Sequence, residues 1–131
     1  MNVNRYVFAS LAAFAFVFAF DFLLHGTFLH SIYQETQHLW RPEGETNMAM
    51  MVGSELLFSL MFTCMYSRYG VGQNLKEGGR FGLCVGLIFA AVTLGTYCYM
   101  PIPFVLTASW MIGDLLRCSG AGVVAALIYK K

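Results

Sequence analysis

Charged residues are scarce in this sequence. Only 11% of its 131 residues are Asp, Glu, Lys or Arg, whereas 58% are hydrophobic, and the mean hydropathy is +0.62. Soluble domains carry about 25% charged residues, so the composition predicts an integral membrane protein rather than a soluble domain. The formal net charge is +1, and there is no basic tail or acidic run, so nothing indicates a nucleic-acid partner.

Paired cysteines and catalytic motifs are missing as well. None of the four cysteines forms a C-x-x-C pair, and all four lie in apolar segments, which is typical of small buried side chains rather than of a disulfide framework or a zinc site. The chain has no Ser-His-Asp elbow, phosphate-binding loop, dinucleotide fingerprint or H-E-x-x-H motif. We therefore expect a protein that is not an enzyme.

Proline is rare, which leaves long uninterrupted apolar runs. A helix needs about 20 such residues to cross a bilayer, and four runs fit, over about residues 6–30, 48–67, 81–100 and 104–129. Two of the three prolines, Pro101 and Pro103, lie between the last two runs, where they end one helix before the next begins. The sequence thus predicts an all-α bundle of four transmembrane helices in a single domain, residues 1–131, whose last two helices form a tight hairpin.

The first run has an alternative interpretation as a signal peptide, because Arg5 provides a positive charge before it. The run is long, however, it contains Asp21 and His25, and no small-x-small cleavage site follows. We therefore expect a retained membrane span.

Basic residues indicate the orientation of the bundle. The loop of residues 31–47 contains only Arg41 against three glutamates. Six other basic residues fall on the opposite side of a four-span topology: Arg5, Arg68, Lys76, Arg80, Lys130 and Lys131. Because basic residues remain on the cytoplasmic side, we expect both termini in the cytoplasm, the loop of residues 31–47 in the periplasm, and a bacterial inner membrane as the location.

A few polar residues interrupt the apolar runs. They are Asp21 and His25 in the first run, Glu55 in the second, and Asp114 and Arg117 in the fourth. A charge at the bilayer centre costs about 2.5–3.5 kcal/mol on insertion scales. With a rise of about 1.5 Å per residue, the charged groups of these three helices lie at a similar depth. We therefore expect them to meet in one intramembrane polar cluster.

The expected cluster has several possible roles. Asp114 and Arg117 can pair within one helix, and His25 can bond to Asp21 four residues earlier. Three carboxylates then face one arginine, so either a carboxyl group carries a proton or a cation is bound. Three interpretations remain open: a structural ionic network, proton or cation handling, and a metal ion such as zinc, iron or manganese held by Asp21, His25 and Glu55. A haem or pigment on a span histidine also remains possible.

Glycines at helical spacing predict close helix packing. Small residues four apart let two helices approach closely, either within one chain or between copies. Small residues of this kind occur where the third helix opens and in the fourth run: Gly78, Gly82, Gly86, Gly113 and Gly120. Together with the excess of carboxylates, they favour a homo-oligomer or a subunit of a larger membrane complex, with the lipid bilayer as its other partner.

The overall plan resembles small uncharacterised bacterial four-helix integral membrane proteins of the domain-of-unknown-function type. The matching features are a polar first span, a Trp-containing loop, a glycine-rich third span and a short proline turn. The residues concerned are Asp21, His25, Gly26, Trp40, Gly82, Gly86, Pro101 and Pro103. The resemblance implies a topology and no activity.

The expected function is therefore that of a non-enzymatic membrane component held together by its ionic cluster, either as an oligomer or as an accessory subunit of a larger complex. The alternative is a proton- or cation-handling carrier or channel. In that case Asp21, Glu55 and Asp114 would bind the ion, His25 would relay protons or act as a ligand, and Arg117 would be the counter-ion.

Overall fold

A computed structural model describes residues 2–70 and 74–129. In this part of the chain four helices are long and apolar enough to cross a membrane. They are α1 (Val3–Leu23), which continues as the π-helical turn η1 (Leu24–Phe28), α3 (Met48–Tyr69), α4 (Leu75–Thr96) and α5 (Phe104–Ile128). Between η1 and α3 lie three short elements: α2 (His30–Glu35), η2 (Gln37–Leu39) and η3 (Glu43–Glu45). The expected all-helical architecture with four membrane-length helices is confirmed.

Asparagine caps explain why some helices extend beyond the apolar runs. The Asn2 side chain accepts a hydrogen bond from the Arg5 amide at 3.1 Å, so α1 starts before residue 6. Asn74 accepts one from the Glu77 amide at 3.0 Å, so α4 starts six residues before the apolar run at 81. These caps satisfy amides that have no partner within the helix. The first turn of α4 contains charged residues, so the helix begins before the apolar run does.

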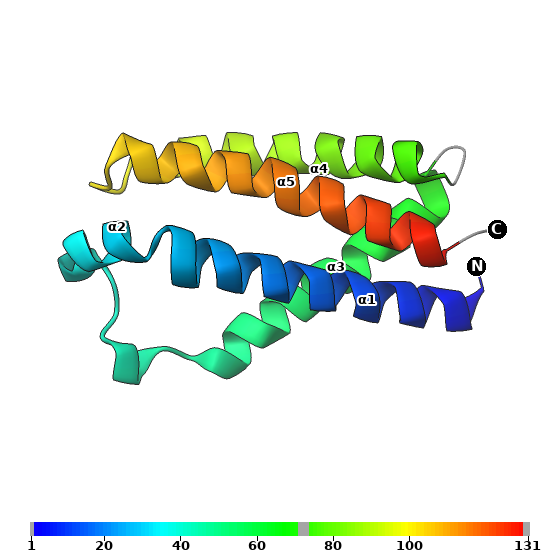
Figure 1. The fold of residues 1–131 in the computed structure, drawn as a ribbon, viewed down its shortest axis with the longest axis horizontal. Coiled ribbons are helices and arrows are strands. Elements are labelled where there is room, and N and C mark those ends of the chain that lie inside the picture. Colours follow the sequence, from blue (N-terminus) through cyan, green and yellow to red (C-terminus); the bar gives the residue numbers. More distant parts are fainter. Residues whose placement is uncertain (1, 71–73, 130–131) are drawn as a thin grey trace.

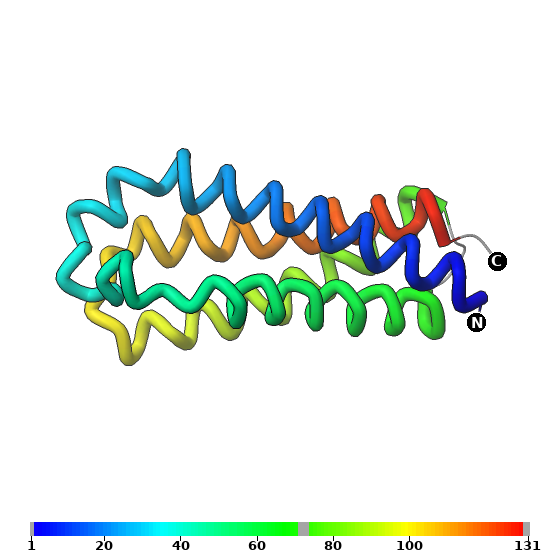
Figure 2. The backbone as a smooth tube through the Cα atoms, turned by 90° about the horizontal axis from the view of Figure 1, so that it is seen from below, coloured from blue at the N-terminus to red at the C-terminus, as the bar shows by residue number. Residues whose placement is uncertain are grey.

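The four long helices differ in how closely they pack against one another, and α4 and α5 form the closest pair. α4 and α5 lie side by side along their length, and α1 packs against both α5 and α3 (Figures 1 and 2). α3 crosses α1 at an angle rather than running parallel to it (Figure 1). The start of α1 and the end of α5 lie at the same end of the bundle (Figure 1).

The glycines of α4 make the close contact with α5 possible. A Cβ atom at Gly82 would overlap the carbonyl group of Cys118, and one at Gly86 would lie 2.9 Å from the carbonyl oxygen of Asp114. Gly78 likewise faces the backbone of Gly122. The predicted small face of the third span is therefore used inside the protein, where backbone approaches backbone.

The glycines of α5 on its other side face the first span. A Cβ atom at Gly113 would meet the side chain of Leu24, and one at Gly120 would meet the ring of Phe16. Both small faces predicted from the sequence thus pack within one chain. They give no support to the expectation of a homo-oligomer, because their surfaces are covered by the protein's own helices.

Candidate functional site

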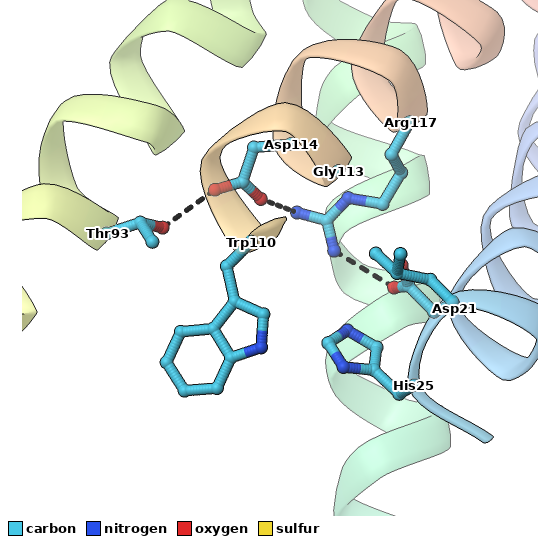
Figure 3. A pocket seen from close by; sticks show the side chains of 8 residues that line it. Asp21, His25, Thr93, Trp110, Gly113, Asp114 and Arg117 are labelled. Carbon is cyan, nitrogen blue, oxygen red and sulfur yellow. Dashed lines mark hydrogen bonds and ion pairs between the residues drawn. The ribbon is translucent and has the colours of Figure 1, made fainter. Parts of the chain in front are cut away.

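Arg117 joins three of the long helices. Its Nη1 donates to Asp21 Oδ2 of α1 at 2.9 Å, and its Nη2 donates to Asp114 Oδ1 of α5 at 3.0 Å. The hydroxyl group of Thr93 on α4 donates to Asp114 Oδ2 at 2.7 Å (Figure 3). We call Asp21, Thr93, Asp114 and Arg117 the ionic cluster. Its ion-paired side chains are 12–19% exposed, so the two ion pairs are largely buried within the protein.

The ionic cluster confirms the predicted pair within α5 and adds a member from α4. Asp114 and Arg117 are three residues apart, which places them on one helix face. Thr93 belongs to the same helix face as the α4 glycines, and it extends this face beyond Gly86 and Ala90 toward Asp114. Its position was visible in the sequence pattern, but its bond to Asp114 required knowledge of how α4 and α5 pack.

Two aromatic rings complete the surroundings of the guanidinium group. The Cζ atom of Arg117 lies 5.4 Å from the ring centroid of Phe58 on α3 and 5.7 Å from that of Phe89 on α4. At such distances a ring face attracts a cation. The charge of Arg117 is therefore stabilised by groups from all four long helices.

His25 does not form the expected bond with Asp21. Its Nδ1 lies 2.6 Å from the hydroxyl group of Tyr33 on α2, and Asp21 is bonded to Arg117 instead. Two causes account for this difference. A charged guanidinium group is a stronger partner for a carboxylate than a neutral imidazole, and His25 lies in the π-helical turn η1, whose wider winding departs from α-helical spacing.

Tyr33 connects His25 to the fourth span. The indole Nε1 of Trp110 on α5 lies 2.7 Å from the Tyr33 hydroxyl oxygen and donates to it, because an indole N–H can only donate. The hydroxyl group of Tyr33 can then donate to His25 Nδ1, which leaves the proton of a neutral imidazole on Nε2. Burial raises the pKa of Tyr33 above its ordinary value of 10.0, so the hydroxyl group is protonated at neutral pH.

The Tyr33→Phe substitution tests this chain of hydrogen bonds. It leaves the Trp110 N–H without its acceptor, and we expect it to lower the free energy of unfolding by about 1–2 kcal/mol at pH 7. A raised pKa in the folded state means that stability is present below pH 10 and falls as the pH rises beyond it. Phenylalanine has no hydroxyl group to titrate. The variant should therefore lose less stability than the wild type when the pH is raised from 9 to 11.

Thermal unfolding in detergent at several pH values measures both effects. Tyr99→Phe is the matched control, because the Tyr99 side chain is 90% exposed. If Tyr33→Phe and Tyr99→Phe have equal effects on stability and on its pH dependence, the hydrogen-bonded role of Tyr33 is wrong.

Glu55 approaches the ionic cluster without joining it. Its carboxylate oxygen Oε2 is buried, yet it has no hydrogen-bond partner among the described residues. Glu55 lines two cavities that Arg117 also lines. Of the five predicted cluster residues, the structure therefore bonds Asp21, Asp114 and Arg117 together, places His25 beside them and leaves Glu55 across a cavity.

Arg117 lines three cavities, and two of them also share Asp21 and His25. The smaller one, of about 180 Å³, is lined by the ionic cluster together with His25, Trp110 and neighbouring residues (Figure 3). The larger one, of about 540 Å³, lies between α1 and α3, and its lining includes Asp21, His25, Glu55 and Arg117. Asp21, His25 and Arg117 thus form a wall shared by both cavities.

The predicted metal site is not assembled. In residues 2–70 and 74–129, no group of three or more His, Cys, Asp or Glu side chains is placed to hold a metal ion. Asp21 is bonded to Arg117 and His25 to Tyr33, so two of the three expected ligands have other partners. Glu55, the third expected ligand, has a buried carboxylate oxygen that lacks a partner among the described side chains.

The sequence pattern is the basis for relating this chain to other proteins. The resemblance to small bacterial four-span proteins stays a prediction, because comparisons with protein-family models, with curated proteins and with solved structures found no match.

Proposed function

We propose that this chain is a non-enzymatic integral membrane component whose ionic cluster fixes the relative positions of α1, α4 and α5. It would act as an oligomer or an accessory subunit of a larger complex in a bacterial inner membrane, with both termini in the cytoplasm. The observation that supports this proposal is the double bonding of Arg117 to carboxylates of α1 and α5, together with the bond from Thr93. Partners for so many buried polar groups indicate that holding the helices together is one role of the site.

The native mass of the protein tests the assembly part of this proposal. We expect gentle extraction into lipid nanodiscs, followed by native mass spectrometry, to give a species well above the 14.6 kDa of one chain. A single chain without any co-purifying partner, across several extraction conditions, would contradict an oligomer or accessory subunit.

A second candidate function is proton or cation handling, and one specific observation favours it. Glu55 carries a buried carboxylate oxygen without a partner among the described residues, beside a cavity shared with Arg117 and Asp21. An unpaired carboxylate inside a membrane is costly unless it binds a proton or a cation. Glu55 would then be the exchanging group, Asp21 and Asp114 would hold Arg117 as counter-ion, and His25 would relay protons toward Tyr33.

The Glu55→Gln substitution separates the two candidate functions. It removes the exchangeable charge but no side-chain hydrogen bond within the described residues, so we expect the variant to fold normally and to lose proton-coupled flux in reconstituted vesicles. Flux is measured with a pH-sensitive dye inside the vesicles. Glu43→Gln is the matched control, because Glu43 lies on the exposed turn η3, far along the chain from the ionic cluster. Unchanged flux in Glu55→Gln would exclude the second candidate and leave the structural one.

A further inference from the structure

The larger cavity has the size of a small-molecule site. Its volume of about 540 Å³ lies within the range of about 300–1,000 Å³ that such sites occupy. Phe18, Asp21 and Phe22 of α1 line one side, and Met48, Met51 and Glu55 of α3 line the other. These residues come from the second half of α1 and the first half of α3. The buried residues of α3, such as Thr63, lie in its second half, and those of α1 lie between Ala9 and Val17, before the residues that line the cavity. α3 crosses α1 at an angle (Figure 1), and the cavity lies at the end of α3 that begins with Met48.

The charges around this cavity favour a cation. Two carboxylates, those of Asp21 and Glu55, line this cavity together with one guanidinium group, that of Arg117. Asp21 and Glu55 thus lie on two different helices that border the same space. Glu55 lines the cavity, and its buried oxygen Oε2 has no hydrogen-bond partner among the described residues.

The other walls favour an organic cation over a metal ion. Phe18 and Phe22 are aromatic, and aromatic faces attract organic ammonium groups. Met48 and Met51 offer flexible thioethers that adapt to apolar shapes. A hard metal ion requires several oxygen or nitrogen ligands at once, and the described residues provide no group of three.

We propose that the cavity between α1 and α3 binds a hydrophobic protonated amine. Its ammonium group would lie at the Glu55 carboxylate, across the cavity from the Asp21 carboxylate that Arg117 already holds, and its apolar part would pack on Phe18, Phe22 and the methionines. The Glu55 carboxylate would select an ammonium ion that can donate a hydrogen bond over a quaternary ion that cannot. This inference rests on the second candidate function, because it assigns a ligand class to the exchange at Glu55.

Equilibrium binding to the whole protein in lipid nanodiscs tests the proposal. The probe is fluorescent 1-naphthylmethylammonium, and 1-naphthylmethanol has the same ring without the charge. After subtraction of binding to empty nanodiscs, we expect saturable binding of the ammonium probe, at least about tenfold tighter than that of the alcohol. Glu55→Gln should weaken the ammonium probe by about tenfold and leave the alcohol unchanged, as expected for the loss of one charge-assisted bond. Glu43→Gln should bind like the wild type.

A second pair of variants examines the aromatic wall. Phe22→Ala should weaken the ammonium probe severalfold, whereas Phe8→Ala should not, because Phe8 lies in the other half of α1. The two side chains are similarly exposed, 67% for Phe22 and 66% for Phe8, so both variants should fold. Equal affinity for ammonium and alcohol, or ammonium binding unaffected by Glu55→Gln, would overturn the proposal.

The flux experiment distinguishes failure of this inference from failure of the second candidate function. Flux that depends on Glu55, combined with no saturable ammonium binding, would overturn the organic-amine ligand and retain proton or small-cation handling. Absence of both Glu55-dependent flux and ammonium binding would overturn both proposals.

Discussion

Replacement of Arg117 by methionine is expected to lower the free energy of unfolding by about 3–5 kcal/mol. The substitution removes the partner of two carboxylates whose side chains are only 13% and 12% exposed. Methionine retains most of the length of the side chain, so the loss arises from unpaired charge rather than from an empty space. Reversible unfolding in mixed detergent micelles, followed by circular dichroism, measures the effect.

A triple variant separates unpaired charge from lost packing. When Arg117→Met is combined with Asp21→Asn and Asp114→Asn, no charge is left unpaired in the ionic cluster, and we expect most of the stability to return. Arg80→Met is the control for an ion pair at the surface. Its bond to Glu77 involves side chains that are 63% and 28% exposed, so its loss should cost no more than about 1 kcal/mol. Equal losses for Arg80→Met and Arg117→Met would show that the ionic cluster does not hold the helices together.

Gly82→Ala is expected to have the second-largest effect, with a loss of about 3 kcal/mol, at the upper end of the usual range for overpacking. The added methyl group would overlap the backbone carbonyl group of Cys118 on α5. Backbone atoms cannot move away by a side-chain rotation, so α4 and α5 must separate. Separation would also lengthen the bond from Thr93 to Asp114. The same unfolding experiment measures the loss.

The neighbouring glycine provides a matched control. A Cβ atom at Gly79 would lie 3.5 Å from Val123 Cγ2, which is an ordinary contact. Gly79→Ala should therefore be neutral or should stabilise the protein by up to about 1 kcal/mol, because alanine is the better helix former. If Gly79→Ala and Gly82→Ala were equally harmful, the close approach of α4 and α5 at Gly82 would not be the cause.

Much of the fold could be predicted from the sequence because length and hydropathy determine it. Four apolar runs gave four long helices, and the three-residue spacing of Asp114 and Arg117 gave their pair. The glycine spacing of α4 identified a close packing face. These predictions depend on local geometry, which one helix fixes by itself.

The partners of individual polar residues were harder to predict, because depth along a helix does not fix its rotation. Glu55 lies near the ionic cluster but faces a cavity, since α3 crosses α1 at an angle (Figure 1). His25 binds Tyr33, a residue of the segment between the spans, because η1 departs from α-helical winding. The expected metal ligands are not assembled for the same reason. Tertiary packing determines that Asp21 pairs with Arg117 and that His25 pairs with Tyr33.

The bond between Asp21 and Arg117 joins residues 96 positions apart, and this separation has a consequence for biogenesis. Because synthesis proceeds from the N-terminus, α1 reaches the membrane with its carboxyl group well before the ribosome has produced α5. During this interval insertion of the first helix must overcome the cost of Asp21 without its guanidinium partner, about 2.5–3.5 kcal/mol for a charge at mid-membrane. The surrounding phenylalanines of α1 compensate for this cost, so the helix that carries the acid is also the most apolar of the four, with a hydropathy of 2.3 against 1.6 for each of the others.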